Sequence, residues 1–147
     1  MAYEKRTGSL LFSSDKKRLN VKFIHNYLSK ESYWSKNISL SLVKKSIKGS
    51  VCFGVYKNKK QIAFARMVTD EATFGYLADV FVIEDFRGKG ISKQLMRFIM
   101  DYPKFRSLRS IMLATLDAHG LYEQFGFKRI NAPGRYMNIK FFEEYKK

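Results

Sequence analysis

The stretch that decides the fold is VFVIEDFRGKGISKQLM, residues 80–96. It begins with an apolar, β-rich run and ends with apolar residues spaced as on one face of a helix. Two glycines and three basic residues lie between. Glycines let the backbone approach a ligand closely, and the free N–H groups of a first helical turn attract negative charge. The stretch predicts a strand, a loop suited to an anion and a helix, although a purely structural glycine turn is an equal interpretation.

Three known phosphate-binding loops can be compared with this stretch. A Walker A loop requires GxxxxGK[ST], but Ile83 stands where its first glycine would be. The dinucleotide pattern GxGxxG fails because Lys93 occupies the place of its third glycine. The remaining template is R-x-x-G-x-G/A after a strand, which is matched by Arg87, Gly90 and, imperfectly, Ser92.

The rest of the chain alternates helical and strand-like patterns without repeats or proline-rich linkers. Asn20 and Ser39 are candidate N-caps of two early helices. Further segments are predicted as a hairpin at 51–56 and 61–68, strands at 74–83, 109–116, 127–130 and 135–142, a helix from 91, and a short helix at 117–125 capped by Asp117. These elements predict one domain, residues 1–147, with an α/β or α+β sheet and helices packed on it.

The composition limits the classes of partner. The chain carries 28 lysine and arginine residues against 13 aspartate and glutamate residues, a formal net charge of +15. The basic residues are scattered, so a generally cationic surface is favoured and nucleic-acid binding is a weak alternative. No stretch resembles a signal peptide or reaches the length of a membrane span, so a cytoplasmic protein without a membrane partner is expected. Cys52, the only cysteine, is predicted to be a small core residue, and no metal is expected.

Two motifs resemble those of the GNAT superfamily of N-acetyltransferases. Residues 80–96 are similar to the acetyl-CoA loop of that family, V-x-P-x-x-R-G-x-G-x-G/A, with Glu84 in place of the proline. LYEQFGF, residues 121–127, resembles its second signature, LYEKxGF, at the expected spacing. The order of elements also fits along essentially the whole chain. The resemblance implies acetyl-CoA as cosubstrate and a mixed, mostly antiparallel central sheet of about six to seven strands, flanked by about four helices, with splayed central strands.

The resemblance also implies how acetyl-CoA binds. The strand ending at Val82 would pair with the pantetheine arm, and a backbone N–H near Val82 would polarise the acetyl carbonyl. Thr115 stands where many members have an asparagine that contacts pantetheine, which leaves that contact open. The pyrophosphate would lie in the loop of residues 87–92. The implied acetyl-CoA-binding residues are Val80, Phe81, Val82, Arg87, Gly88, Lys89, Gly90, Ile91, Ser92 and Thr115.

Acetyl transfer to an amine involves two proton movements. An alkyl amine with a pKa near ~10 must lose a proton before it attacks, and a thiolate with a conjugate pKa of about 8.5 benefits from gaining one. Tyr122 matches the family's usual general acid, although spacing alone favours a core aromatic. Asp79 is the first candidate for the base, directly or through a water; a solvent-facing or bulge residue is the alternative. Asp117 and His119 rank second and third, because a helix cap and a structural histidine explain them more simply.

The acceptor side is expected at the loop between the first two helices, which carries Tyr33 and Trp34. An aromatic wall would suit an aromatic or cationic amine, but ordinary packing explains these residues equally well. The expected function is an N-acetyltransferase that moves acetyl from acetyl-CoA directly to a primary amine, of a small molecule or a protein, through a tetrahedral intermediate. The alternatives are a non-catalytic acetyl-CoA-binding module and, less favoured, a basic nucleic-acid-binding domain. A monomer and a homodimer are both compatible with the sequence.

Overall fold

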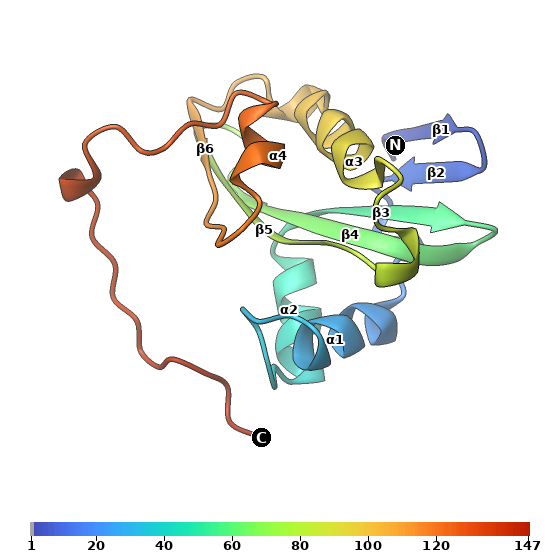
Figure 1. The fold of residues 1–147 in the computed structure, drawn as a ribbon, viewed down its shortest axis with the longest axis horizontal. Helices are drawn as coiled ribbons and strands as arrows, with labels where there is room; N and C mark the ends of the chain where they lie inside the picture. Colours follow the sequence, from blue (N-terminus) through green and yellow to red (C-terminus); the bar gives the residue numbers. More distant parts are fainter. Residues whose placement is uncertain (1) are drawn as a thin grey trace.

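A mostly antiparallel sheet forms the centre of the computed structural model, which describes residues 2–147 (Figure 1). Its six strands are β1 (Glu4–Thr7), β2 (Leu10–Ser13), β3 (Val51–Lys57), β4 (Lys60–Thr69), β5 (Phe74–Val82) and β6 (Ser110–Met112). They lie in chain order across the sheet, and only β5 and β6 are parallel neighbours. The predicted mixed sheet is therefore confirmed.

Helices cover both faces of this sheet. Within residues 2–147 there are four α-helices: α1 (Val21–Lys30), α2 (Leu40–Lys48), α3 (Ile91–Met100) and α4 (His119–Glu123). Figure 1 shows α1 and α2 on one face and α3 and α4 on the other. One apolar cluster accordingly joins α3 to Phe53 and Ile62, while a second joins α1 and α2 to Phe64 and Phe81. The expected α/β architecture, with helices packed against the sheet, is confirmed.

The first two helices begin where their capping residues predict. The Asn20 side chain accepts a hydrogen bond from the backbone N–H of Phe23 at 3.0 Å, and the Ser39 hydroxyl accepts one from Leu42 at 3.2 Å. Each cap satisfies one of the backbone donors that a helix leaves free in its first turn. The Ser39 cap lies at the end of the 31–38 connection, which carries the predicted acceptor-side aromatics.

Cys52 lies within β3 and is buried in the cluster beneath α2. Its thiol is 3.7 Å from the carbonyl oxygen of Ile47. Burial raises the pKa of this thiol to about 11. The prediction that Cys52 is a small core residue is confirmed.

Both ends of the chain differ from the expectation. The hairpin of β1 and β2 was not predicted, because its strands are only four residues each and β1 is exposed along its length. The predicted strand at 109–116 shortens to β6, and the predicted strands at 127–130 and 135–142 are wrong for the described chain. The helix expected from Asp117 begins instead at His119, with Ala118 as its N-cap and no side-chain cap.

The two parallel strands, β5 and β6, separate along their length. β5 pairs with β6 only at Phe74, Gly75 and Tyr76, and β5 then continues to Val82 without β6 beside it. The splay expected of the central strands is therefore confirmed. It leaves one edge of β5 free of strand pairing over its second half. None of the helices described here is long and apolar enough to cross a membrane.

Candidate active site

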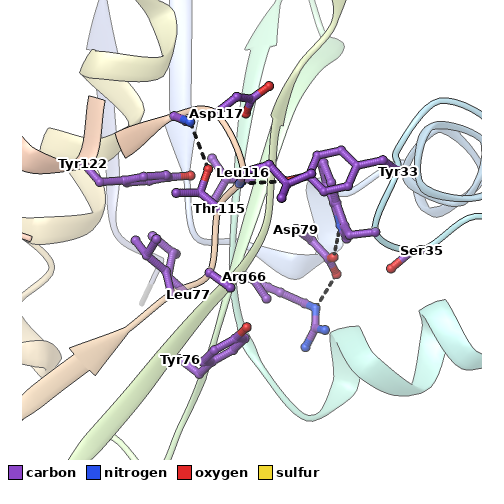
Figure 2. Close-up of a pocket in the computed structure, with 16 residues that line it drawn as sticks. Tyr33, Ser35, Arg66, Tyr76, Leu77, Asp79, Thr115, Leu116, Asp117 and Tyr122 are labelled. Atoms are coloured by element: carbon purple, nitrogen blue, oxygen red, sulfur yellow. Dashed lines mark hydrogen bonds and ion pairs between the residues drawn. The ribbon is translucent and has the colours of Figure 1, made fainter. Parts of the chain in front are cut away.

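A cavity of about 480 Å³ occupies the splay between β5 and the segment after β6. Residues 76–80 of β5 form one wall, residues 113–118 form the opposite wall, and residues 33–35 form the rim. Tyr122 of α4 also lines the cavity, and Figure 2 shows Tyr122 and Tyr33 approaching it from opposite sides. The structure thus brings together both predicted catalytic residues, both predicted acceptor-side aromatics and Thr115.

A bulge in β5 sets the wall of this cavity. Phe81 pairs with Phe64 and Ala78 pairs with Arg66, so two residues, Asp79 and Val80, lie opposite the single Ala65. Asp79 has a φ of 54°, in the left-handed region that a non-glycine residue rarely adopts. The bulge interrupts the ladder at the point where the free edge of β5 faces the cavity. Backbone groups there are free of the regular β4 pairing.

The Asp79 carboxylate is held from two sides. Arg66 donates from Nε to Asp79 Oδ2 at 2.6 Å, and the indole Nε1 of Trp34 donates to Oδ1 at 2.8 Å (Figure 2). The side chain of Asp79 is only 7% exposed, and Arg66 also donates to the Ser50 hydroxyl at 3.1 Å. Both carboxylate oxygens therefore accept a hydrogen bond, one from the charged guanidinium of Arg66 and one from the indole of Trp34.

Arg66 is the site residue that the sequence reasoning missed. A charged residue inside the otherwise apolar run QIAFARMV was a usable signal, because a buried charge requires a partner. The partner could not be identified from the sequence, since it depends on the register between β4 and β5.

Tyr122 lies where α4 packs against the core. Its side chain is buried, and its ring meets that of Phe127 edge-to-face at a centroid distance of 5.9 Å. Burial raises the pKa of the phenol to about 12, with smaller contributions from Tyr33 and the Asp117 carboxylate. At neutral pH the phenol is protonated and can donate a hydrogen bond into the cavity.

Two contacts connect the 33–35 rim to the cavity walls. Trp34 reaches the β5 bulge through Asp79, while the Tyr33 hydroxyl accepts a hydrogen bond from the backbone N–H of Leu116 at 3.3 Å. The two aromatic rings meet edge-to-face at 5.0 Å. Both remain partly exposed, so each presents ring surface at the mouth of the cavity.

Thr115, Asp117 and His119 occupy different places around the site. The Thr115 hydroxyl accepts a hydrogen bond from the backbone N–H of Ala118 at 3.0 Å, which forms the turn into α4 (Figure 2). Asp117 lines the cavity near the rim. His119 lines a neighbouring groove instead, away from Asp79. Among residues 2–147, no group of three or more histidine, cysteine or acidic side chains could hold a metal ion.

The predicted pyrophosphate loop follows β5 and leads into α3. Gly88 and Gly90 have φ values of 77° and 78°, and a Cβ at either position would meet no atom within 4 Å. The glycines are therefore required for backbone conformation and not for space. Gly90 stands directly before α3, so backbone donors of Ile91 and Ser92 belong to its first turn.

Arg87 braces this loop from within. Its Nε donates to the carbonyl oxygen of Val82 at 2.9 Å, and its Nη2 donates to the Tyr27 hydroxyl at 2.8 Å. The ring of Tyr27 stacks on Phe81 at 3.8 Å, which joins α1 to the end of β5. Lys89, by contrast, extends its ammonium group over the ring of Phe86 at 5.2 Å.

Comparisons with known proteins agree with one another. The model of the acetyltransferase (GNAT) family matches residues 21–127. A crystal structure from Xanthomonas campestris, assigned in its description to the GNAT family, is 41% identical, with a TM-score of 0.89, and the match covers 94% of this chain and 96% of that one. A curated Gibberella zeae protein, whose name assigns it provisionally to the acetyltransferases, is 27% identical over 78% of this chain and 76% of its own. A Clostridium acetobutylicum acetyltransferase structure described with acetyl-CoA shares the fold, at 18% identity and a TM-score of 0.66 over 89% of this chain and 96% of its own.

Proposed function

The chain belongs to the GNAT family of acetyltransferases, and on that premise we propose that it transfers an acetyl group from acetyl-CoA directly to a primary amine. The observation that carries the proposal is the cavity in the splay, where the free edge of β5 and the protonated Tyr122 face one space. The acetyl donor and the amine would meet there, and the tetrahedral intermediate would form beside the β5 bulge.

The residues present fit acetyl-CoA. The unpaired half of β5, including Val80, Phe81 and Val82, offers backbone groups to the peptide-like pantetheine arm. Gly88 and Gly90 give the loop a conformation in which its backbone can approach a pyrophosphate, and the α3 N-terminus favours negative charge. The pyrophosphate would lie along residues 87–92, with Arg87 keeping the loop in place and Lys89 adding positive charge.

Tyr122 is proposed as the proton donor to the leaving sulfur. When bound, acetyl-CoA would supply the acetyl group, and coenzyme A would leave as a thiolate when the C–S bond of the thioester breaks. A phenol with a pKa raised to about 12 stays protonated at every physiological pH, so it is always able to stabilise that thiolate with a hydrogen bond.

The amine acceptor would enter at the rim of Tyr33 and Trp34. The Asp117 carboxylate and the aromatic ring of Tyr76 line the same cavity and would attract an ammonium group, while the Asp79 carboxylate is paired with Arg66, which lines the cavity as well. Asp79 was predicted as the base, and this stays a prediction. Its bonds to Arg66 and Trp34 favour a role in positioning the rim and stabilising positive charge, with the proton leaving through water.

The direct test is an assay of thiol release with acetyl-CoA and a panel of amines: alkyl diamines, arylalkylamines, amino sugars and lysine peptides. We expect acetyl-CoA to raise the melting temperature, because a ligand of the native state stabilises it. We also expect thiol release with at least one amine class. A higher melting temperature without thiol release on any amine would indicate a binding module. An unchanged melting temperature at saturating acetyl-CoA would contradict the proposal altogether.

A further inference from the structure

Arg66 is a mostly buried cation whose hydrogen-bonding capacity is only partly used. It lies in β4 between the apolar residues Ala65 and Met67, and its side chain is only 19% exposed. A guanidinium group carries five N–H donors. Nε donates to Asp79 at 2.6 Å and Nη1 donates to Ser50 at 3.1 Å. The other N–H donors of the group, including both on Nη2, have no partner within residues 2–147.

These unused donors are accessible to a ligand. Within residues 2–147, the buried side-chain nitrogen and oxygen atoms without a hydrogen-bond partner are Tyr56 Oη and Gln94 Oε1. Nη2 of Arg66 is not one of them, so it lies at a surface that another molecule can reach. Arg66 lines the cavity of the proposed active site, where Figure 2 shows it next to Asp79. A molecule bound in the cavity can therefore accept hydrogen bonds from Arg66.

Neighbouring side chains hold the guanidinium in one position. Asp79, which accepts from Nε, is itself held by the indole of Trp34 at 2.8 Å. Ser50, which accepts from Nη1, donates its own hydroxyl proton to the carbonyl oxygen of Ser46 in α2 at 2.7 Å. A guanidinium that is already positioned loses little freedom when it binds a ligand, and its planar fork matches a carboxylate.

Stability alone does not account for the pair of Arg66 and Asp79. The desolvation of two buried charges offsets most of their mutual attraction, and apolar residues of similar size stabilise a core equally well. β4 is otherwise apolar from Ile62 to Val68, so an apolar residue at position 66 would fit the pattern of the strand. Binding of a charged group in the cavity gives the pair a function.

The opposite wall of the cavity carries a negative charge. Asp117 lines this wall, its side chain is exposed, and it makes no hydrogen bond within residues 2–147. The Asp117 carboxylate is close enough to Tyr122 to help raise the pKa of the phenol. Because Tyr122 is the proposed proton donor, the attacking amine belongs at this end of the cavity. The cavity therefore offers a carboxylate near the reacting groups and guanidinium donors on the wall formed by β4 and β5.

We propose that the acceptor is a small aminocarboxylate, whose carboxylate binds Arg66 while its amine lies beside Asp117 and Tyr122. This inference rests on the proposed function, because it specifies the acceptor for the same cavity. A singly charged carboxylate suits the site better than a doubly charged phosphate, since Asp79 already compensates the charge of Arg66. The formal net charge of +15 would attract such an anionic group to the protein.

Matched acceptors test the requirement for a carboxylate. Each set contains an aminocarboxylate, its methyl analogue, the diamine and the phosphonate on the same carbon chain. One set is γ-aminobutyrate, butylamine, putrescine and aminopropylphosphonate, and further sets are built on β-alanine and alanine. Thiol release from acetyl-CoA is measured for every member. In the most active set, we expect kcat/KM for the carboxylate to exceed that of the other members by about tenfold or more.

The outcomes separate this inference from the function on which it rests. Equal or higher kcat/KM for the methyl analogue, the diamine or the phosphonate would overturn the inference and leave the acetyltransferase function standing. The absence of turnover with every amine, including the wider panel above, would overturn both.

Variants test whether Arg66 is the residue that binds the carboxylate. Arg66→Lys keeps a cation beside Asp79 but loses the planar fork, so the ratio of kcat/KM for the carboxylate to that for its methyl analogue should fall about tenfold. The ratio is taken within one protein, so any loss of folded protein cancels. Arg109→Lys makes the same change at an exposed residue outside the cavity and should keep the ratio within about twofold.

A second variant covers the case in which Arg66→Lys does not fold. The double variant Arg66→Met, Asp79→Asn leaves no unpaired charge, and it should lose the preference for the carboxylate as well. An unchanged ratio in a folded variant of either kind would overturn the assignment of the carboxylate to Arg66.

Discussion

Tyr122, the proposed proton donor, is a buried side chain whose pKa depends on its surroundings. Its pKa is raised to about 12 by burial, above the ordinary tyrosine value of 10.0. The phenol therefore holds its proton more firmly in the folded protein than in the unfolded chain. This contribution to stability is fully present below about pH 10 and is lost as the pH rises toward about 12.

For activity, we expect Tyr122→Phe to lower kcat by about 10²- to 10⁴-fold, the range for removal of a positioned proton donor. The affinity for acetyl-CoA, measured by calorimetry, should change by less than about twofold, since the ring is retained. The wild-type kcat should show no fall due to Tyr122 up to about pH 10. Normal turnover in the phenylalanine variant would remove Tyr122 from the mechanism.

The pair of Arg66 and Asp79 is a second determinant at the residue scale. Asp79→Asn leaves the Arg66 guanidinium, 19% exposed, without its anionic partner. We expect a loss of about 2–4 kcal/mol in the free energy of unfolding, measured in urea. The double variant Arg66→Met, Asp79→Asn should lose less than the two single variants together, because no unpaired buried charge remains.

Kinetic measurements on Asp79→Asn and Trp34→Phe distinguish whether Asp79 acts as the base or as a positioning residue. If Asp79 positions the rim, Trp34→Phe, which removes only the indole donor to Asp79, should reduce kcat/KM by a factor similar to Asp79→Asn. If Asp79 is the base, only Asp79→Asn should abolish the acidic limb of the pH–rate profile. An acidic limb that persists in Asp79→Asn would exclude Asp79 as the base.

At the scale of elements, the junction of β5 and α3 carries the loop proposed to bind the pyrophosphate of acetyl-CoA. We expect Gly90→Ala to cost about 1–2 kcal/mol, because its φ of 78° is strained for any residue with a Cβ. Acetyl-CoA affinity should fall as well, since the loop would relax toward ordinary φ values. Gly120→Ala, inside α4 and also without neighbours within 4 Å, is the control and should be neutral or slightly stabilising. Equal losses at both glycines would contradict this account.

Elements with local signals were predictable from the sequence. Asn20 and Ser39 mark the starts of α1 and α2, and the β3–β4 hairpin and α3 follow from periodicity. The short β1 and β2 lack such signals, and they are held by pairing with β3. Residues 135–142 were predicted as a strand because their apolar and polar side chains alternate, but the pattern alone does not provide a paired neighbour, and the segment pairs with no strand of the described sheet.

At the scale of the whole molecule, the site arises from contacts distant in sequence. The family motifs predict Tyr122, the loop of residues 87–92 and the splay. They do not predict that Arg66 pairs with Asp79, or that Trp34 bonds to a residue 45 positions away, because both depend on a bulge in the register of β4 and β5. The net charge of +15 is likewise a property of the whole surface, and no single cationic cluster follows from it.

Because Cys52 is buried, its thiol should react very slowly with thiol reagents while the protein is folded. With a pKa of about 11, roughly one thiol in a thousand is ionised at pH 8, and that fraction is enclosed by the core. A chromogenic disulfide therefore detects coenzyme A released in turnover without a background from the enzyme. The same thiol becomes reactive only when the core opens. The rate at which Cys52 is labelled in the absence of substrate therefore reports how often the protein unfolds.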